Sequence, residues 1–253
     1  MNKRGVEPQV LVVLIIAIAS AIVLFSFGYS TAGTLKENAD VDTCRLSVMA
    51  QSQTKFFGKS VVKLDCPRRN IKIFENKVEL NGKASKKYSF GKLTQEEVNK
   101  IAAEELRLCW YKMAEGNQNV FEESYIFGTD RTCLICSEIQ FDEKIKTRQF
   151  TGIDNYLRNR TMPKSTMNYW EYLVRNQNHP AAKLPWSQYT PWGSAQTGKI
   201  YESVFNSNEK YLVYFLAYKP PRVAEFIGAY PSIYYIGLGK ADKIREECDI
   251  LMN

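Results

Sequence analysis

The sequence predicts an α+β protein with one N-terminal transmembrane helix, followed by a mixed extracytoplasmic domain that has a mainly antiparallel sheet, a few helices and disulfide staples. Three observations support this prediction. An apolar run lies near the N-terminus, all six cysteines follow it, and strand-like and helix-like periodicities alternate in the remainder of the chain. The composition, 45% hydrophobic and 24% charged, is typical of a globular chain and argues against extensive disorder.

The apolar run extends from Val10 to Phe27, and only two serines interrupt it. As a helix that rises about 1.5 Å per residue, the run spans roughly 27 Å, close to the ~30 Å hydrocarbon layer of a bilayer. A buried core helix is the alternative, but such a helix normally has a polar edge, which this run lacks. We therefore expect a cytoplasmic leader over residues 1–9 and a transmembrane helix over residues 10–29.

The charges on either side of the apolar run predict its orientation. Lys3 and Arg4 precede the run, whereas small and polar residues follow it and lead into a net negative segment over residues 36–42. The bias of positive residues toward the cytoplasm keeps the N-terminus inside and exports the rest of the chain. The predicted location is the cell membrane, in contact with membrane lipid, with a polar connector over residues 30–43 and an extracytoplasmic domain over residues 44–253.

All six cysteines lie on the predicted outer side of the membrane. An even number of cysteines in an exported domain indicates up to three disulfides, and the sequence does not choose among the fifteen possible pairings. The cysteine positions and the charge asymmetry are independent observations, and both place the domain outside. The candidates are Cys44, Cys66, Cys109, Cys133, Cys136 and Cys248.

The segment Lys3–Pro8, which reads KRGVEP directly before the apolar run, resembles the class III signal peptide of archaeal type IV pilin-like proteins. The resemblance covers about the first 30 residues, with Glu7 where that family usually has Ser. It implies that a prepilin-type peptidase cuts after Gly5 and leaves Val6 as the mature N-terminus. An uncleaved signal anchor and a secretory signal peptide that ends near residues 30–33 are the alternatives. The remainder resembles uncharacterised membrane-anchored proteins of small-genome archaea, from which no activity carries over.

The first part of the domain, over residues 44–92, has a pattern that favours strands. Ser60–Cys66 and Ile71–Phe74 are short runs rich in β-branched and apolar residues. Asn81 and Gly82 together form a strong signal for a two-residue hairpin turn.

The clearest helix of the domain begins after Thr94. Thr94 and Glu97 have the spacing of a capping box, and Gly116 stands where a left-handed C-terminal cap is expected. Because Cys109 lies on the apolar stripe of this helix, its sulfur is expected to face the core. The stripe consists of Val98, Ala102, Leu106, Cys109 and Met113.

The C-terminal half of the chain predicts further strands and helices around a long loop over residues 180–198. The run Tyr211–Tyr218 is continuously apolar or aromatic apart from its tyrosine hydroxyls, as is typical of a central strand buried on both faces. We expect it to pair with the strand before it around a polar turn. The expected strands are Thr132–Phe141, Lys199–Asn206, Lys210–Tyr218 and Ser232–Ile236, and the expected helices are Ile153–Asn159, Met167–Arg175 and Ala241–Asp249.

Cys133 and Cys136 form a CxxC motif within an expected strand, and three interpretations are open. A zinc site requires about four ligands, and the single histidine, His179, lies in a loop beside Pro180. A redox-active pair normally stands at a helix N-terminus, where the helix dipole lowers the thiol pKa. Structural disulfides to other cysteines are the third interpretation, and one sulfur can reach Cys109 to join helix to sheet.

A strong basic bias marks residues 44–92, which contain twelve Lys or Arg and three Asp or Glu. An anionic partner outside the cell would explain it, and so would a solvated lysine face. Lipid headgroups, acidic surface polymers and DNA are candidates, but sparse aromatic interleaving gives no basis for specific nucleic-acid binding. The predicted patch consists of Lys55, Lys59, Lys63, Arg68, Arg69, Lys72, Lys83, Lys86 and Lys87.

Two further features occur in the second half of the domain. The loop that contains Trp186, Tyr189 and Trp192 could expose aromatic rings for sugar or protein recognition, with core packing under a long loop as the alternative. The tripeptide at residues 159–161, Asn-Arg-Thr, is an N-glycosylation sequon, which has meaning only if the domain is outside.

Together these patterns predict a surface protein that acts by adhesion, by pilin-like assembly or by binding an extracellular partner. Other surface or filament subunits and anionic surface polymers are the expected partners. We identify no catalytic constellation, no metal site and no cofactor. The alternative function is that of a membrane-tethered thiol-disulfide oxidoreductase that uses Cys133 and Cys136.

Overall fold

The structure is a computed structural model of the 253-residue chain. It describes residues 39–56, 59–60, 62–118, 121, 130–145, 147–174, 203–219, 233–248 and 250–252. Met1–Asp42 and Thr43–Asn253 form two compact units, and the second unit is the domain described below. The expected leader with its Gly5–Val6 junction and the expected transmembrane helix over residues 10–29 lie outside the described residues. None of the helices among the described residues has the length and apolarity to cross a membrane.

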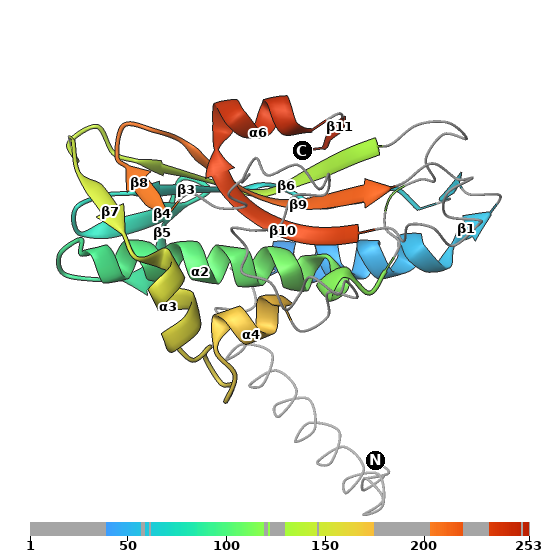
Figure 1. Ribbon diagram of the computed structural model, residues 1–253, viewed down its shortest axis with the longest axis horizontal. Coiled ribbons are helices and arrows are strands. Elements are labelled where there is room, and N and C mark those ends of the chain that lie inside the picture. Colours follow the sequence, from blue (N-terminus) through green and yellow to red (C-terminus); the bar gives the residue numbers. More distant parts are fainter. Residues whose placement is uncertain are drawn as a thin grey trace, which may run out of the picture. The chain divides into compact units, whose positions relative to one another are not determined.

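A mixed seven-stranded sheet forms the centre of the domain, with the strand order β10-β9-β6-β3-β4-β5 and with β11 beside β6 (Figure 1). β3 and β11 run parallel to β6 along the same edge of it, and the other four pairings are antiparallel. The strands are β3 Arg69–Ile73, β4 Lys77–Leu80, β5 Lys83–Ser89, β6 Asp130–Phe141, β9 Tyr211–Lys219, β10 Ile233–Lys240 and β11 Ile250–Met252. The α+β class is confirmed, and the sheet is mixed.

The described residues also form two small, two-stranded antiparallel sheets outside this sheet. β1 Lys55–Phe56 pairs with β2 Lys59–Ser60, and β7 Gln149–Thr151 pairs with β8 Val204–Asn206.

The hairpin between β4 and β5 turns at the residues that the sequence predicts. Asn81 and Gly82 have φ values of 51° and 77°. Positive φ at both central residues is the requirement of a type I′ turn, whose twist matches that of the flanking strands. This turn prediction is confirmed.

The predicted long helix is α2, Gln95–Lys112, and its start is capped as expected. The Thr94 side chain accepts a hydrogen bond of 3.2 Å from the backbone N–H of Glu97. α2 ends at Lys112 with Met113 as its C-cap, and a short 3-10 turn, Ala114–Gly116, follows. Gly116 is left-handed as expected, with a φ of 71°, but it lies at the end of this turn and does not cap α2 itself. Every residue of the predicted apolar stripe is buried.

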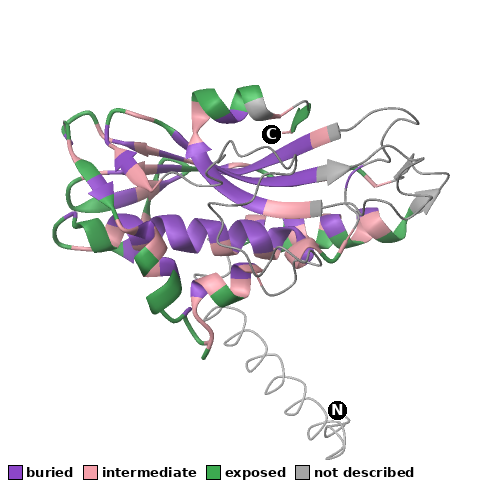
Figure 2. Cartoon of the chain, in the orientation of Figure 1, coloured by how far each residue is buried: buried purple, intermediate pink, exposed green. Residues whose placement is uncertain are grey.

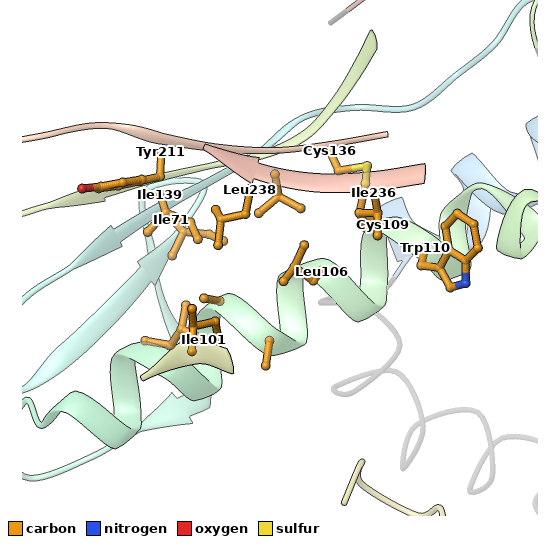
Figure 3. Close-up of a cluster of buried hydrophobic side chains, with 14 of the residues drawn as sticks. Ile71, Ile101, Leu106, Cys109, Trp110, Cys136, Ile139, Tyr211, Ile236 and Leu238 are labelled. Atoms are coloured by element: carbon orange, nitrogen blue, oxygen red, sulfur yellow. A yellow bond between two sulfur atoms is a disulfide. The ribbon is translucent and has the colours of Figure 1, made fainter. Parts of the chain in front are cut away.

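The stripe of α2 packs against the inner face of the sheet and forms the main core. Figure 3 shows Ile101 and Leu106 of α2 pointing toward Ile71, Ile236 and Leu238 of the sheet. Figure 2 shows that burial is continuous along the sheet-facing side of α2 and along the central strands. α3 Ile153–Asn159 and α4 Tyr169–Val174 contact α2 as well, so helices form a second layer beside the sheet.

The opposite face of the sheet has a smaller core. Residues Tyr211–Ala217 of β9 are all buried and alternate between the two cores, which confirms the prediction of a strand covered on both faces. Leu212, Tyr214 and Leu216 of β9 point to this face, and Ile244 of α6, Ala241–Glu247, packs in the same cluster. Figure 1 shows α6 and α2 on opposite sides of the sheet.

Several predicted elements are confirmed and several are wrong. α3 has the predicted bounds, and α4, β6, β9, β10 and α6 lie within or close to the predicted ranges. Residues 39–53 are helical, so the prediction of strands from residue 44 onward is wrong for this segment. The buried residues Cys44 and Val48 lie four apart, which is the spacing of one face of a helix. The expected strand Ser60–Cys66 is wrong over residues 62–66, which form no strand. The chain there leads into Pro67, and the Cys66 side chain is bonded to Cys44.

Two strand pairings differ from the expectation. β8 pairs with β7 and not with β9, because the chain turns after β8 so that the Phe205 and Tyr211 rings meet edge to face at 5.0 Å. β11 was not predicted at all. Three residues are too few to show the two-residue hydrophobic period of a strand, and tertiary contacts decide that β11 lies beside β6.

A substitution in the α2 stripe tests the main core. Leu106→Ala removes a side chain that is 3% exposed, and we expect it to lower the free energy of unfolding by about 2–5 kcal/mol through lost burial and a residual cavity. Urea unfolding followed by circular dichroism measures the change. Leu46→Ala is the matched control, since Leu46 is 66% exposed, and its effect should stay within about 0.5 kcal/mol. Equal effects of the two variants would contradict this core assignment.

Candidate functional site

Three disulfides account for all six cysteines. They join Cys44 to Cys66, Cys109 to Cys136 and Cys133 to Cys248, with Cα–Cα distances of 4.4, 5.5 and 5.8 Å. The predicted link from the CxxC motif to Cys109 is therefore present, and it joins α2 to the central strand β6. The third bond holds the chain after α6 against the same strand.

The two cysteines of the CxxC motif lie on opposite faces of β6. Cys133 belongs to the core beside α6, whereas Cys136 belongs to the core beside α2. Residues three apart in a strand point to opposite sides, because the side-chain period is two. The pairing of β6 with β9 also shifts register between Ile135 and Ser137, so that Cys136 is the residue of a β-bulge.

This geometry bears on the two chemical interpretations of the motif. A thiol-disulfide oxidoreductase requires a bond between the two sulfurs of its motif, and here each sulfur is bonded elsewhere. A zinc site requires thiolates, and disulfide sulfurs do not supply them. Among the described residues there is no cluster of His, Cys, Asp and Glu with a metal-binding arrangement.

The Cys44–Cys66 bond lies where the chain enters the domain through the helix over residues 39–53. Around it, Ser47 accepts a hydrogen bond from the backbone N–H of Asp65 at 3.1 Å. Arg45 of the same helix donates to the backbone oxygen of Tyr111 at 2.6 Å, pairs with Glu115 at 3.2 Å and lies 4.1 Å from the centre of the Tyr111 ring. This entry helix, residues 39–53, is thus joined to the segment before β3 by a disulfide, and it is held to the C-terminal end of α2 by ionic, hydrogen-bond and aromatic contacts.

The domain also contains a buried ionic group between α2 and the sheet. Glu105 accepts two hydrogen bonds of 3.1 Å from Arg69 and one of 2.8 Å from the Tyr88 hydroxyl. The side chains of Arg69 and Glu105 are each 1% exposed. Burial works against the charged form of Glu105, but the Arg69 and Lys87 charges and the hydrogen bonds together lower its pKa below the usual value.

The Tyr88 hydroxyl is held in its protonated form by the same surroundings. Burial and then the negative charge of Glu105 raise the pKa of Tyr88 well above 10.0. Tyr88 therefore acts as a hydrogen-bond donor to Glu105 throughout the physiological range.

The preceding residue on α2, Glu104, forms a second ionic group nearer the surface. Its carboxylate pairs with Lys87 at 2.9 Å and with Arg107 at 3.1 Å, and it accepts a hydrogen bond from the Tyr169 hydroxyl. Burial alone would raise the pKa of Glu104, but Lys87, Arg107 and Tyr169 lower it from 4.5 to about 2. A carboxylate with this pKa stays ionised at neutral pH and does not serve as a general acid.

The sequence-based predictions missed Glu104 and Glu105 and instead assigned Arg69 to an exposed patch. The prediction for Arg69 is wrong, because its guanidinium is buried against α2. A signal was available: Glu105 lies three residues after Ala102, on the stripe that faces the sheet. An acidic residue at such a position requires a buried cation as a partner.

The rest of the predicted basic patch is divided between ion pairs and solvent. Arg68 pairs with Glu138 at 3.3 Å, Lys72 with Asp142 at 3.1 Å, and Lys87 with Glu104. Within residues 44–92, the exposed lysines that form no ion pair with the described residues are Lys63, Lys83, Lys86 and Lys92.

The position of the remaining lysines offers an explanation that requires no partner. Lys83 and Lys86 lie on β5, which is the last strand in the described order of the sheet. Charged side chains on an edge strand oppose pairing with strands of other molecules. The side chains of Lys55 and Lys59 and the aromatic residues Trp186, Tyr189 and Trp192 lie outside the described residues.

Comparison of the chain with protein-family models, with curated proteins and with solved structures found no match. The candidate function therefore depends on the residues of this chain and their geometry.

The buried pair between Arg69 and Glu105 is tested by removing one charge. Glu105→Gln leaves the Arg69 guanidinium without its carboxylate, and we expect a loss of about 3–5 kcal/mol in the free energy of unfolding. The double variant Arg69→Met with Glu105→Leu should regain most of it, because neither member of the pair is left as an unpaired buried charge. Glu96→Gln, at an exposed position in the first turn of α2, is the control and should cost less than about 1 kcal/mol. A small effect of Glu105→Gln in urea unfolding would refute the pairing.

The Glu104 group predicts an acid-sensitive stability. The folded-state pKa of about 2 lies below the ordinary 4.5, so the contribution of Glu104 is complete above about pH 5 and is lost as the pH falls toward 2. Glu104→Gln should lower stability at pH 7 by about 2–3 kcal/mol and should flatten its decline between pH 5 and pH 2. Denaturant titrations across this range measure both effects. Glu96→Gln is the control, because its ion pair with Arg160 is exposed, and an equally steep decline in Glu104→Gln would contradict this assignment.

Proposed function

We propose that this chain is a single-pass membrane-anchored surface protein whose extracytoplasmic domain acts by adhesion or assembly and not by catalysis. The observation that carries the proposal is the complete pairing of the six cysteines, all of which follow the apolar run Val10–Phe27. Structural disulfides form and persist in oxidising compartments outside the cytoplasm. A chain with such a domain and a preceding apolar run flanked by Lys3 and Arg4 fits a membrane anchor with its N-terminus inside.

The position of the disulfides supports a role in which the domain is held under tension. The Cys44–Cys66 bond follows directly after the segment that would emerge from the membrane, so a pull on the anchor reaches residue 66 without extending the residues between. The other two bonds meet on β6 and close the chain from Cys109 to Cys248. Cross-links of this kind restrict the unfolded chain and contribute on the order of 3–5 kcal/mol each.

The sharper form of the proposal is a pilin-like subunit. It is supported by the resemblance of the leader and by the helix over residues 39–53, which carries the exposed apolar side chains of Leu46 and Met49 one turn apart. Side chains of this kind suit a contact with a neighbouring subunit. The simpler form is a stationary anchored domain, whose exposed Lys63, Lys83 and Lys86 would face anionic surface polymers or lipid headgroups.

The proposal is tested on the chain as native cells make it. We expect the protein to remain with membranes after a high-salt wash, because its apolar segment is solvated by lipid, and to show no thiol that reacts with an alkylating reagent without prior reduction. Mass spectrometry of the mature N-terminus should give Val6 for the pilin-like form. Gly5→Leu, which removes the small residue before the cut, should restore Met1 or Asn2.

Three outcomes would decide against these expectations. An intact N-terminus in the chain without substitutions would exclude cleavage after Gly5 and would favour the stationary anchored domain over the pilin-like subunit. A chain that is recovered from the cytosol with six alkylated cysteines would refute the membrane-anchored surface role as a whole. Two reactive thiols at Cys133 and Cys136 would favour the oxidoreductase instead.

A further inference from the structure

The sequon at residues 159–161 lies at an exposed chain segment on the outside of the helical layer. Asn159 is the last residue of α3, and Arg160 follows it in an extended conformation, with φ −104° and ψ 127°. All three residues of the sequon are exposed. It is the only Asn-x-Ser/Thr tripeptide in the chain.

The side chains of Arg158 and Arg160 make tertiary contacts with other described residues, whereas those of Asn159 and Thr161 do not. Arg158 stacks on the Trp170 ring at 3.9 Å, and Arg160 pairs with Glu96 of α2. The Asn159 side-chain amide donates only within its own helix, to the backbone and side-chain oxygens of Asn155. The Thr161 hydroxyl makes no hydrogen bond with the described residues.

A modification of Asn159 would therefore disturb no tertiary contact. N-linked glycosylation replaces one of the two hydrogens on the amide nitrogen and leaves the other available as a donor. One of the two hydrogen bonds to Asn155 can remain. The attached group would project into solvent beside α3, because the side chain already does so.

We propose that Asn159 carries an N-linked glycan, an inference that rests on the extracytoplasmic location proposed above. The Nδ2 atom would form a bond to the anomeric carbon of a glycan that is activated on a lipid phosphate. The bond between that carbon and the phosphate oxygen breaks, the lipid phosphate leaves, and the amide nitrogen loses one proton to a base of the transferase. The sequon hydroxyl of Thr161 is the group that such a transferase recognises.

The experiment compares the full chain and three variants, each made in the native cells and purified from membranes. Mass spectrometry of the peptide that contains Asn159 should show a glycan mass in the unchanged chain. Thr161→Ala should remove that mass completely, and Thr161→Ser should retain it, because the sequon is preserved. Asn155→Gln is the matched control for the local hydrogen bonds and should leave the modification in place.

An unmodified Asn159 in the unchanged chain overturns the inference. Alkylation of the same sample tells whether the proposed extracytoplasmic location is refuted as well. Complete disulfides would refute only the glycan, whereas six free thiols would refute both the glycan and the extracytoplasmic location. A mass increment that persists in Thr161→Ala would also overturn the assignment, because the modified residue would then lie elsewhere. All the substitutions are at exposed positions, so misfolding does not obscure the result.

Discussion

The packing of α2 across the central strands β6 and β9 is the interaction on which the rest of the domain depends. The apolar stripe of α2 meets the inner face of the sheet, and the Cys109–Cys136 bond fixes the two layers at one point of their contact. The other elements attach to this pair: α3 and α4 contact α2, α6 covers the opposite face of β9, and the entry helix is held to the end of α2 through Arg45. Because β9 is buried on both faces, neither core can change volume without affecting a strand that the two cores share.

The buried charges follow from this packing. A helix that lies against a sheet for its full length buries nearly everything on its inner side, including Glu105, and a buried carboxylate is stable only with a cation and hydrogen-bond donors around it. Arg69 and Tyr88 supply these from β3 and β5. Part of the basic bias of residues 44–92 is therefore structural, since its members neutralise acidic residues of α2 and β6. The lysines that remain exposed to solvent or to a partner form a smaller group, which includes Lys83 and Lys86 of the edge strand β5.

The long and regular elements could be predicted because their periodicity extends over enough residues to identify it. α2 has a cap and five stripe positions, and β9 has seven consecutive residues that are buried on one face or the other. The strand at β8 is predicted but its partner is not, and β11 is missed, because three residues carry no period and the partners of both strands are distant in the chain. The prediction for the helix over residues 39–53 is wrong because its buried positions are few and the segment that follows it is rich in strands.

The sequence by itself determined the number of cysteines, the N-cap of α2, the turn at Asn81 and Gly82, the apolar faces and the net positive charge of residues 44–92, because each of these depends on neighbours along the chain. Tertiary structure alone decided that Cys133 and Cys136 bond to different partners, that Arg69 lies inside, and that Glu104 and Glu105 stay ionised. The physical reason is the same in each case. A bulge of one residue at Cys136 and the approach of α2 to the sheet determine which distant groups meet and which of them retain contact with water.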